Sequence, residues 1–300
     1  MKKTPILFVC AAMMLTGCSG ATATIKDKDE TIMTIGDTKY TKGDEYELLK
    51  VSTGTDLTME LVKQAIYKQE VKVTKEMKEK AQEQVNNYKE NMENFDKQIQ
   101  SLGYKNSKQY MNKVLIPSLQ ASELTEKYFT DAKKDVQKTY KPSKARIIQC
   151  ENKATAKKAL KALKSGTDPE EVAQQYMVDS AKYSGKETLI TTKTTDLSTR
   201  LINTLSKTKK AGVIDEVFTN ESSGTTYAYV AVLVSNTYKD IKDDVYTTLS
   251  SGDDDVTKAC LVYYLKKYNF EVHDQDVFNN LKANNPEYLV SRPDLSKSDD

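Results

Sequence analysis

The residue with the most specific chemical context is Cys18, which ends the run Leu-Thr-Gly-Cys at 15–18. An apolar stretch at 6–15 precedes it, and Lys2 and Lys3 make the start of the chain positive. A cysteine thiol placed there can carry lipid, and two or more acyl chains on one residue anchor a protein stably. The small residues before Cys18 suit a backbone that must enter a narrow protease site.

The remaining cysteines and the single histidine offer little further chemistry. Cys150 and Cys260 are too few for a disulfide framework, and we expect two buried thiols, with pairing as the alternative. His273 stands in a polar run, so a histidine-based metal site or catalytic triad is not expected. The sequence therefore predicts no metal and no cofactor.

Residues 1–17 predict a signal peptide, because the apolar stretch is shorter than the roughly 20 residues of a transmembrane helix. The run at 15–18 resembles a bacterial lipobox, which implies cleavage before Cys18 and lipid on its sulfur. We therefore expect a lipid anchor at the extracytoplasmic face of a bacterial membrane, followed by a flexible tether over 18–30. An ordinary signal peptide that contains a cysteine is the alternative.

The charge balance excludes one class of partner. The formal charge of +2 comes entirely from Lys2 and Lys3, so the chain after residue 17 is balanced. A balanced chain has no basic footprint, and we expect no nucleic acid partner.

The elements after the tether predict an α+β fold with a discontinuous, mostly helical domain. Its N-terminal part, 31–140, contains a hairpin, a helix start capped by Thr41 and Asp44, and apolar residues at helical spacing. The predicted segments are a hairpin at 31–40 and helices at 44–51, 59–67, 75–101 and 107–131, the last kinked at Pro117. These long helices suggest an open clamp, and a plain helical bundle is the alternative.

An α+β module follows at 141–236. Its predicted elements are a strand at 145–150, helices at 154–164, from 168 and at 196–207, and strands at 213–214 and 227–235. The loop at 185–195 is expected to be irregular. Two helices within 237–280 carry an apolar face and complete the helical domain, and 281–300 is expected to be a disordered tail.

This layout resembles the PrsA-type foldase lipoproteins, relatives of the SurA chaperones, in which a parvulin-type peptidyl-prolyl isomerase module interrupts a helical chaperone domain. The run 35–44 is similar to the family's V-N-G-x-x-I-T-K-x-E start. The module's signatures are matched at 153–158, 168–176, 179–180 and 211–214. The resemblance implies a foldase that acts on unfolded or newly translocated secreted proteins, and a homodimer is possible.

The resemblance also implies a substrate groove, and there the chain departs from the pattern. Arg146 and Val230 stand where the family has two histidines, and 184–189 replaces a glycine-rich loop. The implied groove residues are Arg146, Leu197, Ile202, Tyr229 and Val230, with Asp179 as the candidate catalytic residue. Burial of all of them in the module core is the alternative.

Prolyl isomerisation crosses a barrier of about 20 kcal/mol without breaking a bond, so an apolar groove and placed hydrogen bonds suffice. Because both histidines are missing, we expect weak or absent isomerase activity and a surviving role in holding clients. The 18 tyrosines and nine methionines are compatible with an adaptable surface. The alternatives are a structural or adhesive surface lipoprotein and a transporter's solute-binding lipoprotein.

Overall fold

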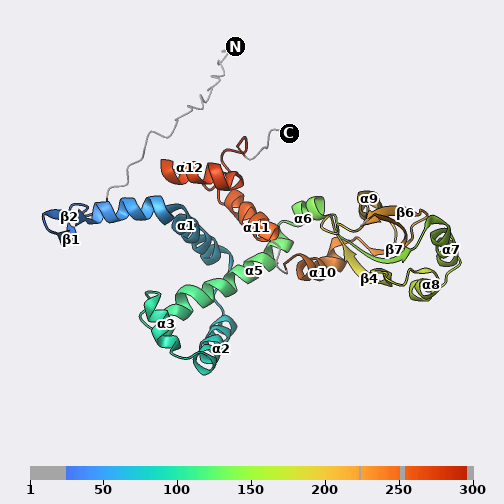
Figure 1. Ribbon diagram of the computed structural model, residues 1–300, viewed down its shortest axis with the longest axis horizontal. Helices are drawn as coiled ribbons and strands as arrows, with labels where there is room; N and C mark the ends of the chain where they lie inside the picture. The colour runs from blue at the N-terminus through green and yellow to red at the C-terminus, as the bar shows by residue number, and fades with distance from the viewer. Residues whose placement is uncertain (1–24, 223, 251–253, 296–300) are drawn as a thin grey trace, which may run out of the picture. The chain divides into compact units, whose positions relative to one another are not determined.

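The computed structural model describes residues 25–222, 224–250 and 254–295 (Figure 1). The predicted signal peptide and Cys18 lie outside these residues. The chain forms two compact units. Unit 1 comprises the described residues up to Gln69 and from Leu261 onward, and unit 2 comprises Glu70–Cys260.

Unit 1 begins with a hairpin and one long helix. Strands β1 (Thr31–Ile35) and β2 (Thr38–Thr41) pair antiparallel, and helix α1 spans Lys42–Glu70. The predicted cap is confirmed, because the Thr41 amide donates to Asp44 Oδ2 at 2.8 Å and the Asp44 amide donates to Thr41 Oγ1 at 3.2 Å. The prediction of two helices at 44–51 and 59–67 is wrong. A single helix runs through Gly54, which a helix tolerates at a cost of about 1 kcal/mol.

The two ends of the described chain are more ordered than the sequence suggested. The Gly43 amide donates to the Lys28 carbonyl at 2.8 Å, so the last residues of the predicted tether belong to the folded chain. Helix α12 (Gln275–Asn284) and a short 3-10 turn, η2 (Pro286–Tyr288), occupy the start of the predicted tail. Leu281 and Leu289 are buried there. The prediction of a disordered tail over 281–300 is therefore wrong for residues 281–295.

Unit 2 starts with a helical half. The helices are α2 (Lys75–Asn91), α3 (Phe95–Ser101), α4 (Ser107–Tyr110), the π-helical turn η1 (Met111–Leu115), α5 (Ile116–Asp131) and α6 (Lys133–Tyr140). The predicted helix at 75–101 is broken because Asn94 adopts a left-handed φ of +57°. The irregularity expected at Pro117 takes the form of the π-helical turn just before it.

Within unit 2, helix α10 (Tyr238–Ser250) and Cys260 contact α5. The Tyr238 hydroxyl of α10 lies 2.6 Å from the Phe129 carbonyl, to which it donates. The ring of Tyr246 lies 5.7 Å from that of Phe129. Helix α11 (Asp254–Lys267) brings Cys260 Sγ to 3.9 Å from the Leu124 carbonyl.

The sheet module lies within unit 2. Strands β3 (Ser143–Cys150), β4 (Ser184–Ile190), β5 (Gly212–Val213), β6 (Phe218–Ser222) and β7 (Thr225–Ser235) form one antiparallel sheet. Helices α7 (Lys153–Lys164) and α8 (Pro169–Tyr176) cover one face, and α9 (Thr199–Lys207) covers the other (Figure 1). The α+β class is confirmed, but the segment expected to be irregular contains strand β4, which pairs with β3.

Candidate functional site

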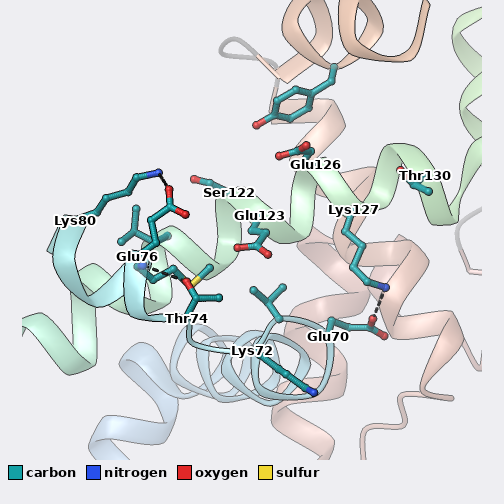
Figure 2. Close-up of a pocket in the computed structure, with 14 residues that line it drawn as sticks. Glu70, Lys72, Thr74, Glu76, Lys80, Ser122, Glu123, Glu126, Lys127 and Thr130 are labelled. Carbon is teal, nitrogen blue, oxygen red and sulfur yellow. Dashed lines mark hydrogen bonds and ion pairs between the residues drawn. The ribbon is translucent and has the colours of Figure 1, made fainter. Parts of the chain in front are cut away.

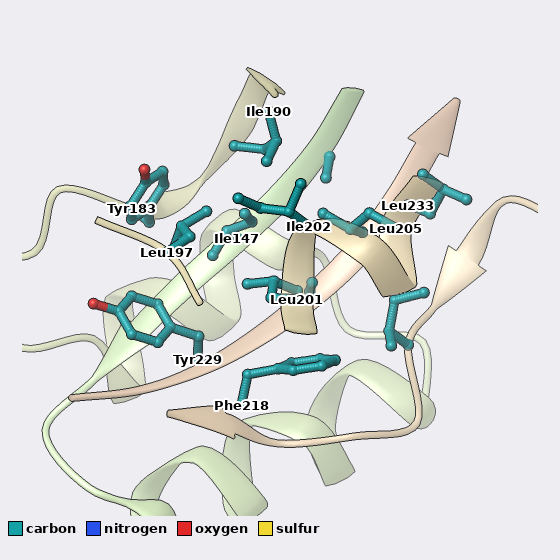
Figure 3. Packing of buried hydrophobic residues seen from close by; sticks show 13 residues of the cluster. Ile147, Tyr183, Ile190, Leu197, Leu201, Ile202, Leu205, Phe218, Tyr229 and Leu233 are labelled. Carbon is teal, nitrogen blue, oxygen red and sulfur yellow. The ribbon is translucent and has the colours of Figure 1, made fainter. Parts of the chain in front are cut away.

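Three of the predicted groove residues fill the core under α9. Leu197, Ile202 and Tyr229 pack with the apolar residues of β3, β7 and α9 (Figure 3). Their side chains are at most 5% exposed. They form the interior of the module, and none of them offers an open surface to a substrate.

The other two groove residues lie on the opposite face of the sheet. Val230 pairs with Ile148, and both are buried against α7 and α8. Arg146 pairs with Val232 on the same face as Val230. Neighbouring residues of a strand point to opposite faces, so Tyr229 and Val230 cannot line one groove. The structure therefore does not bring the predicted groove residues together.

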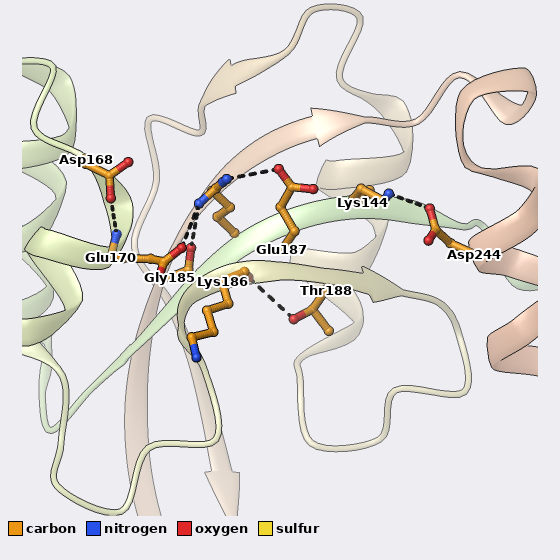
Figure 4. A network of polar contacts seen from close by, with 9 residues as sticks. Lys144, Asp168, Glu170, Gly185, Lys186, Glu187, Thr188 and Asp244 are labelled. Atoms are coloured by element: carbon orange, nitrogen blue, oxygen red, sulfur yellow. Dashed lines mark hydrogen bonds and ion pairs between the residues drawn. The ribbon is translucent and has the colours of Figure 1, made fainter.

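The Arg146 side chain contacts Glu170, Gly185 and Glu187, which are labelled in Figure 4. Its Nη2 lies 3.0 Å from Glu187 Oε1, and its Nη1 lies 3.3 Å from Glu170 Oε1. Nη1 also donates to the Gly185 carbonyl at 3.5 Å. The side chain thus joins β3 to β4 and α8. Asp179, the candidate catalytic residue, lies exposed in the turn after α8.

The α9 face carries a polar cluster at its rim that the sequence analysis missed. The Tyr183 hydroxyl donates to Asp196 Oδ1 at 2.9 Å, and Lys182 Nζ lies 2.9 Å from Asp196 Oδ2. Burial and the nearby carboxylate raise the pKa of Tyr183. Burial acts to raise the pKa of Asp196, but the hydrogen bonds from Lys182 and Tyr183 outweigh it and lower that pKa. Tyr183 and Asp196 are 13 positions apart, and no sequence motif links them.

Exposed apolar side chains gather in unit 1. Among the described residues, nine of the thirteen exposed large apolar side chains lie between Ile32 and Leu61. In α1 they are Leu48, Leu49, Val51, Leu57 and Leu61. Exposed apolar side chains in such numbers are available for contact with a partner. The helical spacing of apolar residues in this region was predicted from the sequence, but their exposure was not.

A cleft of about 820 Å³ adjoins this surface, between the middle of α1 and the α12–η2 segment. We call it the α1–α12 groove. Leu57 lines it and is 55% exposed, while Met59 and Leu281 are buried beneath. Its other lining residues are mostly short and polar; they include Ser52, Thr53, Thr55, Asn280, Asn284 and Asn285.

Ion pairs fix the geometry of the groove. Lys50 Nζ lies 3.1 Å from Asp274 Oδ2 and 2.6 Å from Asp276 Oδ2. Asp274 also caps α12, accepting from the amides of Asp276 and Val277. Hydrogen bonds that the Lys50 ammonium donates to the carboxylates of Asp276 and Asp274 raise the pKa of Lys50. The groove therefore combines a fixed frame, exposed aliphatic contacts and amide groups that can bond to any polypeptide backbone.

A second cleft, of about 550 Å³, lies in unit 2 between α2 and α5 (Figure 2). Its charged groups largely neutralise one another. Glu70 pairs with Lys127 at 2.9 Å, and Glu76 pairs with Lys80 at 2.8 Å. Val71 and Met77, which contribute its apolar lining, are buried. None of its lining residues is among the exposed large apolar side chains of the described chain, whereas Val51 and Leu57 of the α1–α12 groove are.

Comparisons with known proteins find likeness in structure alone. No family model matches the chain, and no curated protein matches it. The peptidylprolyl isomerase (PrsA) from Bacillus cereus is 20% identical, with a TM-score of 0.49, over 91% of this chain and 100% of that one. The foldase protein PrsA from Streptococcus pneumoniae is 18% identical, with a TM-score of 0.38, over 86% and 99%. PrsA from Bacillus subtilis is 19% identical, with a TM-score of 0.37, over 85% and 99%.

The sequence motifs resemble the same family. Because the identities are only 18–20%, no residue role is transferred from these structures, and each role is argued from the side chains of this chain. In the described residues, no helix has the length and apolarity needed to cross a membrane. No cluster of three or more His, Cys, Asp or Glu that could hold a metal ion occurs in the same part of the chain.

Proposed function

We propose that the protein is a membrane-anchored extracytoplasmic chaperone that holds unfolded secreted proteins in the α1–α12 groove. The observation that carries this proposal is the concentration of exposed apolar side chains along α1 beside a polar cleft. An unfolded chain presents aliphatic side chains and unpaired backbone amides together. The groove supplies a complementary surface for both, without requiring a particular sequence.

The lipid on Cys18 is part of the proposal. A tethered chaperone meets clients where they leave the translocation channel, and tethering raises its effective concentration there. The sheet module contributes folding stability to unit 2, and we propose that its isomerase activity is weak or absent. The buried positions of Leu197, Ile202 and Tyr229 support that part of the proposal.

The test is suppression of client aggregation by the chain from residue 18 onward, followed by light scattering of a chemically unfolded client. We expect the protein to suppress scattering and Leu57→Ser to weaken the suppression several-fold. Leu102→Ser is the matched control, because Leu102 is 69% exposed but lies in unit 2. If the unaltered protein leaves aggregation unchanged at several-fold excess, the structural or adhesive reading is favoured.

A further inference from the structure

The β1–β2 hairpin carries large apolar side chains that are exposed in the described part of the chain. Ile32, Met33, Ile35 and Tyr40 are 38–68% exposed. Tyr40 stands opposite Met33, and Ile35 lies on the same face as Met33. Ile32 stands at the β-bulge between Thr31 and Met33. An isolated two-stranded hairpin is marginally stable in water. These side chains are therefore expected to have an apolar partner.

The hairpin is firmly attached to the start of α1. Thr41 and Asp44 exchange two hydrogen bonds at the junction. The Gly43 amide bonds to the Lys28 carbonyl, and Lys42 pairs with Glu30. A Cβ at Gly43 would lie 3.1 Å from the Lys28 carbonyl oxygen, so the two segments are in close contact. The chain that enters the hairpin is thus fixed from Asp27 onward.

The covalent distance from the predicted lipid is short. Asp27, where the hydrogen-bonded turns begin, is nine positions after Cys18 in the chain. At about 3.5 Å per residue this segment reaches at most about 32 Å. With Cys18 in the bilayer, the hairpin is held within that distance of the membrane surface.

We propose that the β1–β2 hairpin contacts the outer surface of the membrane, a step that rests on the lipid anchor of the proposed function. Ile32, Met33 and Ile35 meet the boundary of headgroups and acyl chains, and the Tyr40 ring lies at headgroup depth, where tyrosine is enriched. Lys39 extends its charged end toward lipid phosphates. The contact orients α1 at the membrane in addition to tethering it.

The short tether and the balanced charge of the hairpin suit a lipid surface. Lysines and acidic residues balance over 26–42, so the contact depends on apolar insertion and only weakly on salt. Anchoring supplies the high local concentration that makes such a small contact effective.

The experiment uses the absence of tryptophan from the chain. Tyr40→Trp gives a single reporter in the chain from residue 18, coupled through Cys18 to a maleimide lipid in phosphatidylcholine–phosphatidylglycerol vesicles. Cys150 and Cys260 are buried, so coupling is selective. We expect a blue-shifted emission and several-fold quenching by brominated lipids. Ile35→Trp, beside the turn, is a second reporter in case the first variant is unstable.

Leu61→Trp is the matched control. Leu61 is as exposed as Ile35, and it lies about 30 Å along α1 from the hairpin, at 1.5 Å per residue. Quenching at the hairpin and none at position 61 supports the proposal. Absence of quenching at both hairpin reporters overturns it, and so does a blue shift that depends on protein concentration without vesicles, which would indicate a second copy. Because the lipid is coupled chemically, the quenching result does not depend on lipidation in the cell. It also does not depend on whether the protein holds clients.

Discussion

Lys50 Nζ on α1 lies 2.6 Å from Asp276 Oδ2 in the first turn of α12, and this ion pair sets one end of the α1–α12 groove. The Lys50 side chain is largely covered, whereas that of Asp276 is mostly exposed. The pair is therefore a positioning contact for α12 more than a large source of stability.

Removing the Lys50 ion pairs should reduce the binding of unfolded clients more than the stability of the fold. For Lys50→Met we expect a loss of about 0.5–1 kcal/mol in the free energy of unfolding, typical of a partly exposed ion pair. Aggregation suppression should fall several-fold, because α12 is no longer fixed beside α1. Urea unfolding and light scattering measure the two effects. Asp294→Ala, which breaks the surface pair with Arg292, is the control and should leave both unchanged.

Asp274, which caps α12, should make the stability of the protein depend on pH under acidic conditions. Burial acts to raise the pKa of Asp274, but hydrogen bonds from the Val277 amide and from Lys50 outweigh it and lower that pKa. A carboxylate with a lowered folded-state pKa contributes stability above its unfolded value, near 3.9, and loses it as pH falls through the folded value. Asp274→Asn should flatten the acid limb of a thermal-melting profile. A limb as steep as in the unaltered protein would contradict this assignment.

The stability of the protein at alkaline pH should depend on the Tyr183–Asp196–Lys182 cluster at the rim of the α9 face. Burial, together with Asp196, raises the pKa of Tyr183. Its contribution to stability is complete below the unfolded value of about 10 and is lost as pH rises toward the folded value. Tyr183→Phe should therefore reduce the loss of stability between pH 10 and 11. Tyr40→Phe, at an exposed hairpin position, should leave the profile unchanged.

Restoring the two missing histidines should not create an isomerase. Val230 is fully buried against α7 and α8, and Arg146 is committed to Glu187 and Glu170. Val230→His places a polar ring among apolar side chains, and we expect a loss of about 2–4 kcal/mol in unfolding free energy. The Arg146→His/Val230→His variant should show no gain in turnover of a proline tetrapeptide. A clear gain would show that the two positions share a groove after all.

The two cysteine thiols in the folded chain should be inert. Burial raises the pKa of Cys150 to about 11 and that of Cys260 to about 12. In the native chain from residue 18, a thiol reagent at pH 8 should react rapidly with one group, that of Cys18. In denaturant three groups should react. Rapid reaction of more than one native thiol would mean that the cores around Cys150 and Cys260 open readily.

Local patterns predicted much of the fold. The Thr41–Asp44 cap, the end of a helix at residue 101, the helix that begins at Pro169 and strand β7 follow from residue types at short range. Packing decided the rest. Nothing near Gly54 showed that α1 would run through it, and strand β4 forms because β3 offers an edge to pair with.

The site was harder to predict than the fold. Matching motifs by position placed Tyr229 and Val230 in one groove, although alternation along a strand sends them to opposite faces. The apolar residues of α1 gave no sign of exposure, because exposure depends on what the rest of the chain leaves uncovered. Leu281 lines one side of the groove, although it lies in a segment that was predicted to be a disordered tail.

The central claim is that unfolded clients bind in the α1–α12 groove, and site-specific photo-crosslinking tests it most directly. A photoreactive residue at position 57, inside the groove, is compared with one at position 102, an exposed leucine of unit 2. The account predicts strong crosslinks to an unfolded client from position 57, few from position 102, and loss of both when the client is folded. Equal crosslinking from the two positions, or none from position 57, would contradict it.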